Sequence, residues 1–435
     1  MDWLILLVPV LLGVTVYRRA SQTLALVLMV FYFSLFPLLT IVADNGPYPM
    51  PGAVAPADTV NLLRGVIHLS AFAIGGIWFM SRWRTWPGVS DRALLGFSFL
   101  LVFGQLASLT MNGSFFDTAA LLRSGLSVVY YINLFVIIYT ALKYSDKSQL
   151  ENLAAIYIAI VIGLILISTY SQFLYGGTTE WARRFGRPLH PTVLAALVYV
   201  ALALAFYIRK DLILSLILFG VIILTGSRTA LACIVFMLGL RYVRSAVLIV
   251  LTPIIATIGL IAIDWTHLIN ALAGSALFNR TDWSAGRMAG WVDAVARLPQ
   301  DWLWGIGTRY YRVDPFGSSE VTPGTTRLHD GFLEGLLSFG ILYTIAAVGL
   351  YAYLVWRAYF NASVRDRLSR NERECFQAIV LYACVEFTFG TLYWTDLGDS
   401  LSMVILIFSM VFLVQRSQTP EAVLSQGEVH KPVLS

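Results

Sequence analysis

The amino-acid sequence predicts an all-α polytopic membrane protein, and three observations support this prediction. Hydrophobic residues make up 58% of the chain, whereas only 13% are charged. A soluble protein of the same 435 residues would carry charge on about a quarter of its positions. The apolar residues also come in long runs of about 20, the length that an α-helix needs to cross a bilayer. No soluble core is therefore expected.

The apolar runs predict about 12–13 transmembrane helices. They lie at 3–17, 21–43, 61–80, 93–111, 125–143, 152–175, 190–208, 212–225, 229–243, 246–263, 331–356, 375–394 and 398–415. The first run carries its charge after the apolar residues and has no small-residue cleavage site, so it is interpreted as a membrane helix. The short runs 212–225 and 229–243 are separated only by "TGSR", which predicts a hairpin whose tip stops below the membrane surface.

The runs also divide the chain into segments. They are N-terminal transmembrane helices in 1–175, central helices with arginine-bearing outer turns in 176–263, a large outer loop in 264–328, C-terminal helices in 329–415 and a polar tail in 416–435. Within the outer loop, Met288, Trp291 and Val295 recur at helical spacing. This spacing predicts an amphipathic helix over 285–298 that lies on the outer leaflet.

Basic residues set the orientation. All the lysines, and most of the 30 Lys and Arg residues, fall in loops on one side, which is therefore predicted to be cytoplasmic. On the other side every basic residue is an arginine. Guanidinium keeps its charge when partly desolvated and directs two donors onto phosphate oxygens. This outer arginine set predicts an anionic, lipid-linked ligand such as a diphosphate.

Individual arginines differ in how strongly they indicate such a site. Arg228 ends an apolar run near membrane depth, where a charge is costly and usually faces a cavity or a partner; the alternative is that it extends to the surface. Arg287 falls in the first turn of the amphipathic helix, where exposed backbone N–H groups also favour anions. In the short loop 176–192, Arg184 or Arg187 is expected to contact the ligand.

His329 is the candidate base. It stands at the outer mouth of a predicted helix, and a neutral imidazole there can take a proton from a hydroxyl near neutral pH. Asp330 or Glu334 is a candidate to orient the ring, and the alternative is a purely structural histidine. In "WGIGTRYY", Arg309 and Tyr310 follow a glycine turn, and tyrosine can stack on a sugar face.

Metal and redox chemistry find no support in the sequence. There is no Asp-x-Asp pair, and the three cysteines lie in apolar runs without metal-ligand spacing. Cys233, Cys375 and Cys384 are therefore predicted to be buried apolar residues. No metal and no cofactor are expected, and a diphosphate held by arginines needs no divalent ion.

Several motifs occur in order around the large outer loop. They are "RFGRPLHPTVLA", "TGSRTAL", "AGRMAGWVDAV…WGIG", and His329-Asp330 followed after nine residues by Gly340 and then Tyr343. This order resembles the O-antigen ligase and polymerase superfamily of bacterial inner membranes. Asp330 replaces the usual amide or hydroxyl of the family, and Thr192 replaces an asparagine.

The resemblance implies a GT-C-like helical fold and metal-independent glycosyl transfer at the periplasmic face of the inner membrane. The implied donor is a glycan on undecaprenyl diphosphate. Arg228 and Arg287, with Arg184 or Arg187, would hold the diphosphate, and His329 would deprotonate or position the acceptor hydroxyl. Arg309, Tyr310 and Asp330 would contact substrate.

The acceptor distinguishes two alternatives. A ligase transfers the glycan to a sugar of lipid A–core, whereas a polymerase transfers the growing chain to another lipid-linked repeat unit. One dominant outer loop, 264–328, favours the ligase. A flippase or transporter of lipid diphosphates is the alternative from another class, but it would place charges through the whole membrane depth. Membrane lipids are expected partners, and nucleic acid is not.

Overall fold

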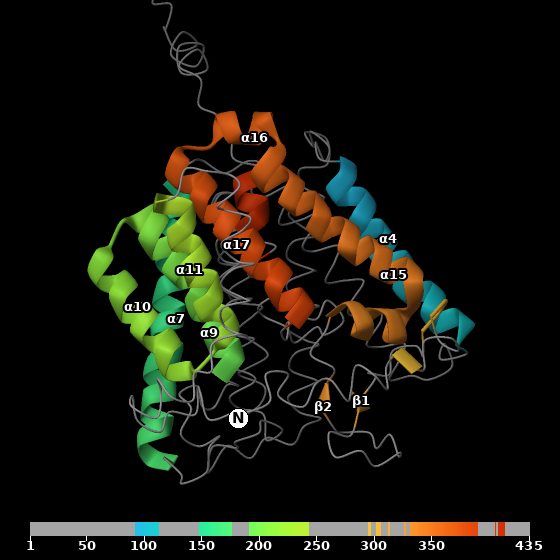
Figure 1. Cartoon of the computed structure of the whole chain (residues 1–435), viewed down its shortest axis with the longest axis horizontal. Coiled ribbons are helices and arrows are strands. Elements are labelled where there is room, and N and C mark those ends of the chain that lie inside the picture. Colours follow the sequence, from blue (N-terminus) through green and yellow to red (C-terminus); the bar gives the residue numbers. More distant parts are fainter. Residues whose placement is uncertain are drawn as a thin grey trace, which may run out of the picture.

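The chain forms a bundle of helices that run mostly between two ends of the molecule in the computed structural model (Figure 1). The structure describes residues 92–112, 148–175, 191–242, 295–296, 302–305, 312–313, 326–327, 331–389, 405 and 408–413. The predicted spans 3–17, 21–43, 61–80, 125–143 and 246–263 lie outside these residues, as do most of 285–298 and of 398–415.

The described elements are almost entirely helical, which confirms the all-α membrane class. They are α4 (Arg92–Met111), α7 (Ser148–Tyr175), α9 (Pro191–Ala203), the π-helix η4 (Leu204–Arg209), α10 (Leu212–Thr225), α11 (Arg228–Tyr242), α15 (Gly331–Val355), the π-helix η5 (Trp356–Phe360), α16 (Ala362–Arg367) and α17 (Arg370–Phe389). A two-residue antiparallel ladder joins β1 (Arg312–Val313) to β2 (Thr326–Arg327). Four described helices are long and apolar enough to cross a membrane; the total of about 12–13 stays a prediction.

Helix α9 lies in the core and is enclosed on nearly every side. All its residues from Leu194 onward are buried, as expected for a helix that is apolar all round. Buried tyrosines connect it to its neighbours. Tyr157 of α7 donates to the Leu197 carbonyl at 2.9 Å, and Tyr199 donates to the Cys233 carbonyl of α11 at 3.3 Å. Each phenol thus buries its ring and still satisfies its hydroxyl.

Helices α10 and α11 form the predicted short hairpin. Asp211 caps α10 by accepting from the Leu214 N–H at 3.0 Å, and Gly226 ends it with φ 69°. Only Gly226 and Ser227 separate the two helices. A helix of 14 residues rises about 21 Å, against about 30 Å for the hydrocarbon layer. These lengths support a tip that stops below the membrane surface.

Helix α15 follows the predicted span 331–356 but is broken in the middle. Gly340 has φ 82° and ψ −176°, a backbone conformation that is essentially confined to glycine. Figure 1 shows the two halves of α15 at an angle to each other, with the longer half beside α4. The hydropathy of the run gives no sign of this break, because Phe339 precedes Gly340, and Ile341 and Leu342 follow it.

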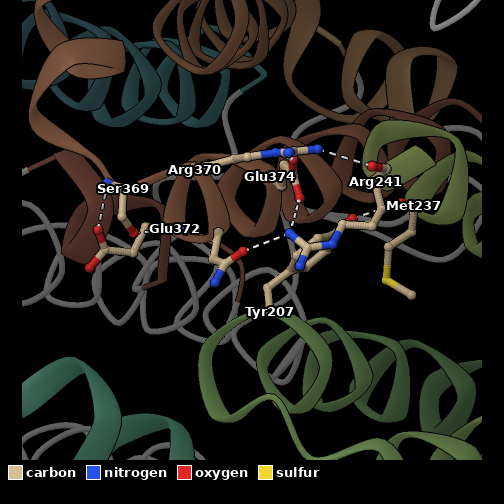
Figure 2. A network of polar contacts seen from close by, with 8 residues as sticks. Tyr207, Met237, Arg241, Ser369, Arg370, Glu372 and Glu374 are labelled. Atoms are coloured by element: carbon tan, nitrogen blue, oxygen red, sulfur yellow. Dashed lines mark hydrogen bonds and ion pairs between the residues drawn. The ribbon is translucent and has the colours of Figure 1, made fainter. Parts of the chain in front are cut away.

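One end of the bundle carries Lys210, Arg241 and Arg370, and we call it the basic end. There the buried Glu374 of α17 accepts from Arg241 of α11 at 3.1 Å and from Arg370 at 2.6 Å. Figure 2 shows this network, in which Arg370 also donates to the Arg241 carbonyl at 3.1 Å. Ser369 and Glu372 form a reciprocal capping box that starts α17. The contacts fix α11 against α17 at this end.

Replacing Glu374 is expected to destabilise the protein. Glu374→Ala removes the carboxylate that two arginines share, and we expect a loss of about 1–3 kcal/mol, seen as a lower melting temperature of the purified protein in detergent. The matched control is Asp366→Ala. Asp366 is paired with Arg365 at the surface, with side chains 69% and 59% exposed, so its loss should change little. Equal effects of the two substitutions would contradict a structural role for the Glu374 network.

Candidate functional site

Among the residues that the sequence nominates for the site, Arg228 and Glu334 lie in the described part of the chain. Arg184, Arg187, Arg287, Arg309, Tyr310, His329 and Asp330 lie outside the described residues. Their roles stay predictions. The described helices nevertheless show where the neighbours of Arg228 and of His329 are located in the bundle.

Arg228 is the first residue of α11 and is half-buried. The preceding Ser227 is buried, and its hydroxyl accepts from the Ala230 N–H at 3.3 Å. A serine cap in this place satisfies one of the free N–H groups that begin every helix. The guanidinium of Arg228 therefore adds its charge to the positive end of the α11 dipole. This combination suits a phosphate oxygen.

The depth of Arg228 in the bundle follows from Tyr199. The Tyr199 hydroxyl lies 3.3 Å from the Cys233 carbonyl of α11 and 3.4 Å from the Ala378 carbonyl of α17, so these two residues are level. From there α11 rises about 7.5 Å to Arg228, and α17 rises about 12 Å to Glu386. Arg228 and Glu386 thus lie within about one helical turn of the same depth, at the end opposite the basic end.

Glu386 is a buried carboxylate at this end of α17, with 2% of its surface exposed. The Tyr382 hydroxyl donates to its Oε1 at 2.9 Å. The Tyr382 ring in turn stacks on Tyr199, with centroids 4.2 Å apart. Because Tyr382 and Glu386 are one turn apart on the same face, Glu386 faces the side of α17 where α9 and α11 pack.

The first turn of α15 meets the same end of α17. A Cβ on Gly331 would lie 2.6 Å from the Phe387 ring and 2.8 Å from the Phe387 carbonyl oxygen. Only glycine allows so close a contact. Gly331 directly follows His329 and Asp330 in the sequence, and Glu334, one turn further, is fully buried. Arg228 and the start of the helix that follows the candidate base are therefore both at the end of the bundle opposite the basic end.

The arrangement places ionisable groups of both kinds at the end of the bundle opposite the basic end. Arg228 supplies a cation at a helix N-terminus, and Glu334 and Glu386 supply buried carboxyl groups near the start of α15 and the end of α17. Ionisable residues at such places in a membrane protein are costly, and they mark ligand or proton pathways. The described residues thus place a guanidinium group at a helix N-terminus and two buried carboxyl groups at one end of the bundle.

Glu386 is the residue that sequence reasoning missed. The span at 375–394 was assigned from its hydropathy, and one glutamate in the run "YACVEFTFG" did not disturb the assignment. An acidic residue inside an apolar run is itself a signal, because its burial needs a compensating partner. The cysteine prediction held for Cys233 and Cys375, which are buried, whereas Cys384 is half-buried.

Part of the chain matches a family model in a comparison with known proteins. Residues 213–348 match the family model described as O-antigen ligase. The matched region includes Arg228, Arg287, Arg309, Tyr310, His329 and Asp330, and it ends just after the break in α15. Glu386, Arg184 and Arg187 lie outside it. No curated protein matches the chain.

Substitution of Glu386 is expected to affect stability through Tyr382. Glu386→Ala leaves the fully buried Tyr382 hydroxyl without its acceptor, which should cost about 1–3 kcal/mol. Glu386→Gln keeps an acceptor oxygen and should cost less. Thr388→Ala is the control, since Thr388 is exposed on the same helix. The melting temperatures of the three variants in detergent measure these losses of stability. Equal losses for Glu386→Ala and Glu386→Gln would contradict a stabilising role for the hydrogen bond and would assign the effect to the charge.

Proposed function

We propose that this protein, whose match over residues 213–348 supports the O-antigen ligase and polymerase superfamily, is a glycosyltransferase that uses a polyprenyl-diphosphate-linked glycan. The match itself supports an O-antigen ligase- or polymerase-type function. The finer assignment is to a ligase: transfer of the glycan from undecaprenyl diphosphate to a sugar of lipid A–core. The site would face the periplasm from the bacterial inner membrane.

The observation that carries the proposal is the position of Arg228. It begins α11 inside the matched region, and its depth is within about one helical turn of Glu386. Gly331, the second residue after His329, packs on the same end of α17 as Glu386. A cation at a helix N-terminus and a candidate base at one end of a membrane bundle are what a reaction on a lipid diphosphate requires. The diphosphate needs fixed positive charge, and the acceptor hydroxyl needs a proton acceptor.

The proposed reaction is a single displacement at C1 of the donor sugar. The bond between C1 and the diphosphate oxygen breaks, and a bond between the acceptor oxygen and C1 forms on the opposite face. Because the acceptor attacks the face opposite the leaving group, the anomeric configuration inverts, and His329 takes the proton of the acceptor hydroxyl. The leaving diphosphate carries the electron pair, and Arg228, Arg287 and either Arg184 or Arg187 stabilise its charge as it develops.

No metal ion is required by this scheme, because the arginines supply the positive charge. Guanidinium groups bind two oxygens of a phosphate at once, which fixes the leaving group as well as neutralising it. Both substrates are lipids, so they would reach the site laterally from the outer leaflet. Arg309, Tyr310 and Asp330 are proposed to contact the sugars near the acceptor hydroxyl.

Purified protein with lipid-linked donor and lipid A–core acceptor should transfer glycan in the presence of EDTA. His329→Ala, Arg287→Ala and Arg228→Gln should each lower the rate, by about 10²–10³-fold for the loss of one charge-stabilising contact. Arg209→Gln is the matched control, because Arg209 is exposed near the basic end and should leave the rate unchanged. Undiminished transfer by His329→Ala, or a need for divalent metal, would overturn the proposed site.

A strain without the protein separates ligase from polymerase. Loss of a ligase should leave lipid A–core bare and glycan accumulated on its polyprenyl carrier, because the final transfer is missing. Loss of a polymerase should instead leave cores that carry single repeat units. Gel analysis of lipopolysaccharide, with extraction of the lipid-linked pool, measures both. A full ladder of capped cores in the deletion strain would exclude both assignments.

A further inference from the structure

The break in α15 holds a turn that precedes β1 in the chain. In this contact, which we call the dock, residues 302–305 pack against residues 338–341 of α15. We propose that the dock positions the transfer site. Gly305 and Gly340 are then positioning residues of the proposed reaction. The inference rests on the function proposed above, and it assigns a role to two glycines that the sequence motifs contain but to which the sequence analysis gave none.

Two glycines make the dock possible. The Ile341 N–H, released by the break, donates to the Leu303 carbonyl at 3.3 Å. A Cβ on Gly340 would meet the Leu303 carbonyl and would lie 2.7 Å from the Trp304 carbonyl carbon. A Cβ on Gly305 would lie 2.5 Å from the Ser338 carbonyl carbon. Both glycines have positive φ, 70° and 82°, so each surface of the dock excludes any larger residue.

Helix α4 makes the dock rigid. Asn112 donates to the Trp304 carbonyl at 3.4 Å, and Ser108 donates to the Ser338 carbonyl at 3.4 Å. One turn below, a Cβ on Gly104 would lie 2.9 Å from the Tyr343 Cα. The turn is therefore held by two helices, one of which is the helix that follows His329.

The dock also restrains the chain that leads to the candidate base. After the dock the chain continues to α15, which begins at Gly331, and on the way the ladder pairs Arg312 with Arg327. The stretches between these fixed points are 306–311, from dock to ladder, and 328–330, from ladder to α15. They contain Arg309, Tyr310, His329 and Asp330. All the predicted site residues of this part of the chain are thus bracketed by the dock, the ladder and α15.

The first half of α15 sets the spacing between these fixed points. Residues 331–339 span about 13 Å as a helix, with the dock at one end and the residues after His329 at the other. The nine residues between Asp330 and Gly340 are therefore a rigid spacer. Loss of the dock would free residues 302–305 from α15 and remove one of the fixed points around the predicted site residues. A displacement of about 1 Å at such a site can cost about 10²-fold in rate.

The experiment compares glycine substitutions inside and outside the dock. Gly305→Ala and Gly340→Ala should lower kcat by about 10²-fold, with KM for the lipid-linked donor little changed, because alignment and not binding is lost. Gly163→Ala and Gly220→Ala are matched controls, since a Cβ at either position meets nothing within 4 Å, and both should keep full kcat. Gly305→Ala alters the turn and leaves α15 intact, so it tests the dock even where Gly340→Ala does not fold.

A covalent link supplies the rescue. In the Gly305→Ala protein, the substitutions Leu303→Cys and Ile341→Cys, joined as a disulfide by mild oxidation, should restore part of kcat. Reduction of that disulfide should return kcat to the low value. Full kcat in unlinked Gly305→Ala, a rise in KM alone, or a linked protein that stays slow would overturn the dock while the proposed function stands. An otherwise intact parent protein that transfers no glycan would overturn the proposed function first, and this inference with it.

Discussion

Backbone hydrogen bonding within a bilayer is the constraint on which the rest of this structure depends. Lipid offers no partner to an N–H or carbonyl group, so a spanning helix can break only where protein supplies one. The break at Gly340 meets this requirement through the turn at residues 302–305, which is not part of α15. The Leu303 carbonyl of this turn accepts a hydrogen bond from the Ile341 N–H. This one hydrogen bond gives the Ile341 N–H an acceptor and also holds the turn against α15. The fold and the geometry of the proposed site are therefore determined together.

The core uses polar side chains under the same constraint. Tyr157, Tyr199 and Tyr207 each donate to a backbone carbonyl of a neighbouring helix, at 2.9, 3.3 and 2.6 Å. Such hydrogen bonds specify which helices pair and at what depth. Dispersion contacts between leucines specify this only weakly. At the basic end, Glu374 performs this task with charges. At the opposite end, the carboxylate of Glu386 accepts a hydrogen bond from Tyr382, at a depth close to that of Arg228.

Among the described residues, the sequence predicted the helices well, whereas the predicted site residues other than Arg228 and Glu334 lie outside them. Hydropathy located α4, α7 and the hairpin of α10 and α11 because long apolar runs have few alternatives in a membrane. It missed the break at Gly340, since the break depends on a turn in a distant segment and leaves the run apolar. Glu386 was missed for a related reason: its partner Tyr382 becomes informative only when α9 and α17 are seen together. The roles of His329 and Arg287 rest on motif and charge.

The shortness of α10 has a consequence for the surrounding lipid. Leu212, Ile213, Leu216, Ile217 and Leu224 are exposed along it, so this face meets acyl chains directly. A face of about 21 Å in a layer of about 30 Å produces hydrophobic mismatch, which the bilayer relieves by thinning. Phospholipid headgroups would then sink beside the hairpin tip. Under the function proposed above, a carrier lipid that diffused into this dimple would already have its diphosphate lowered toward Arg228.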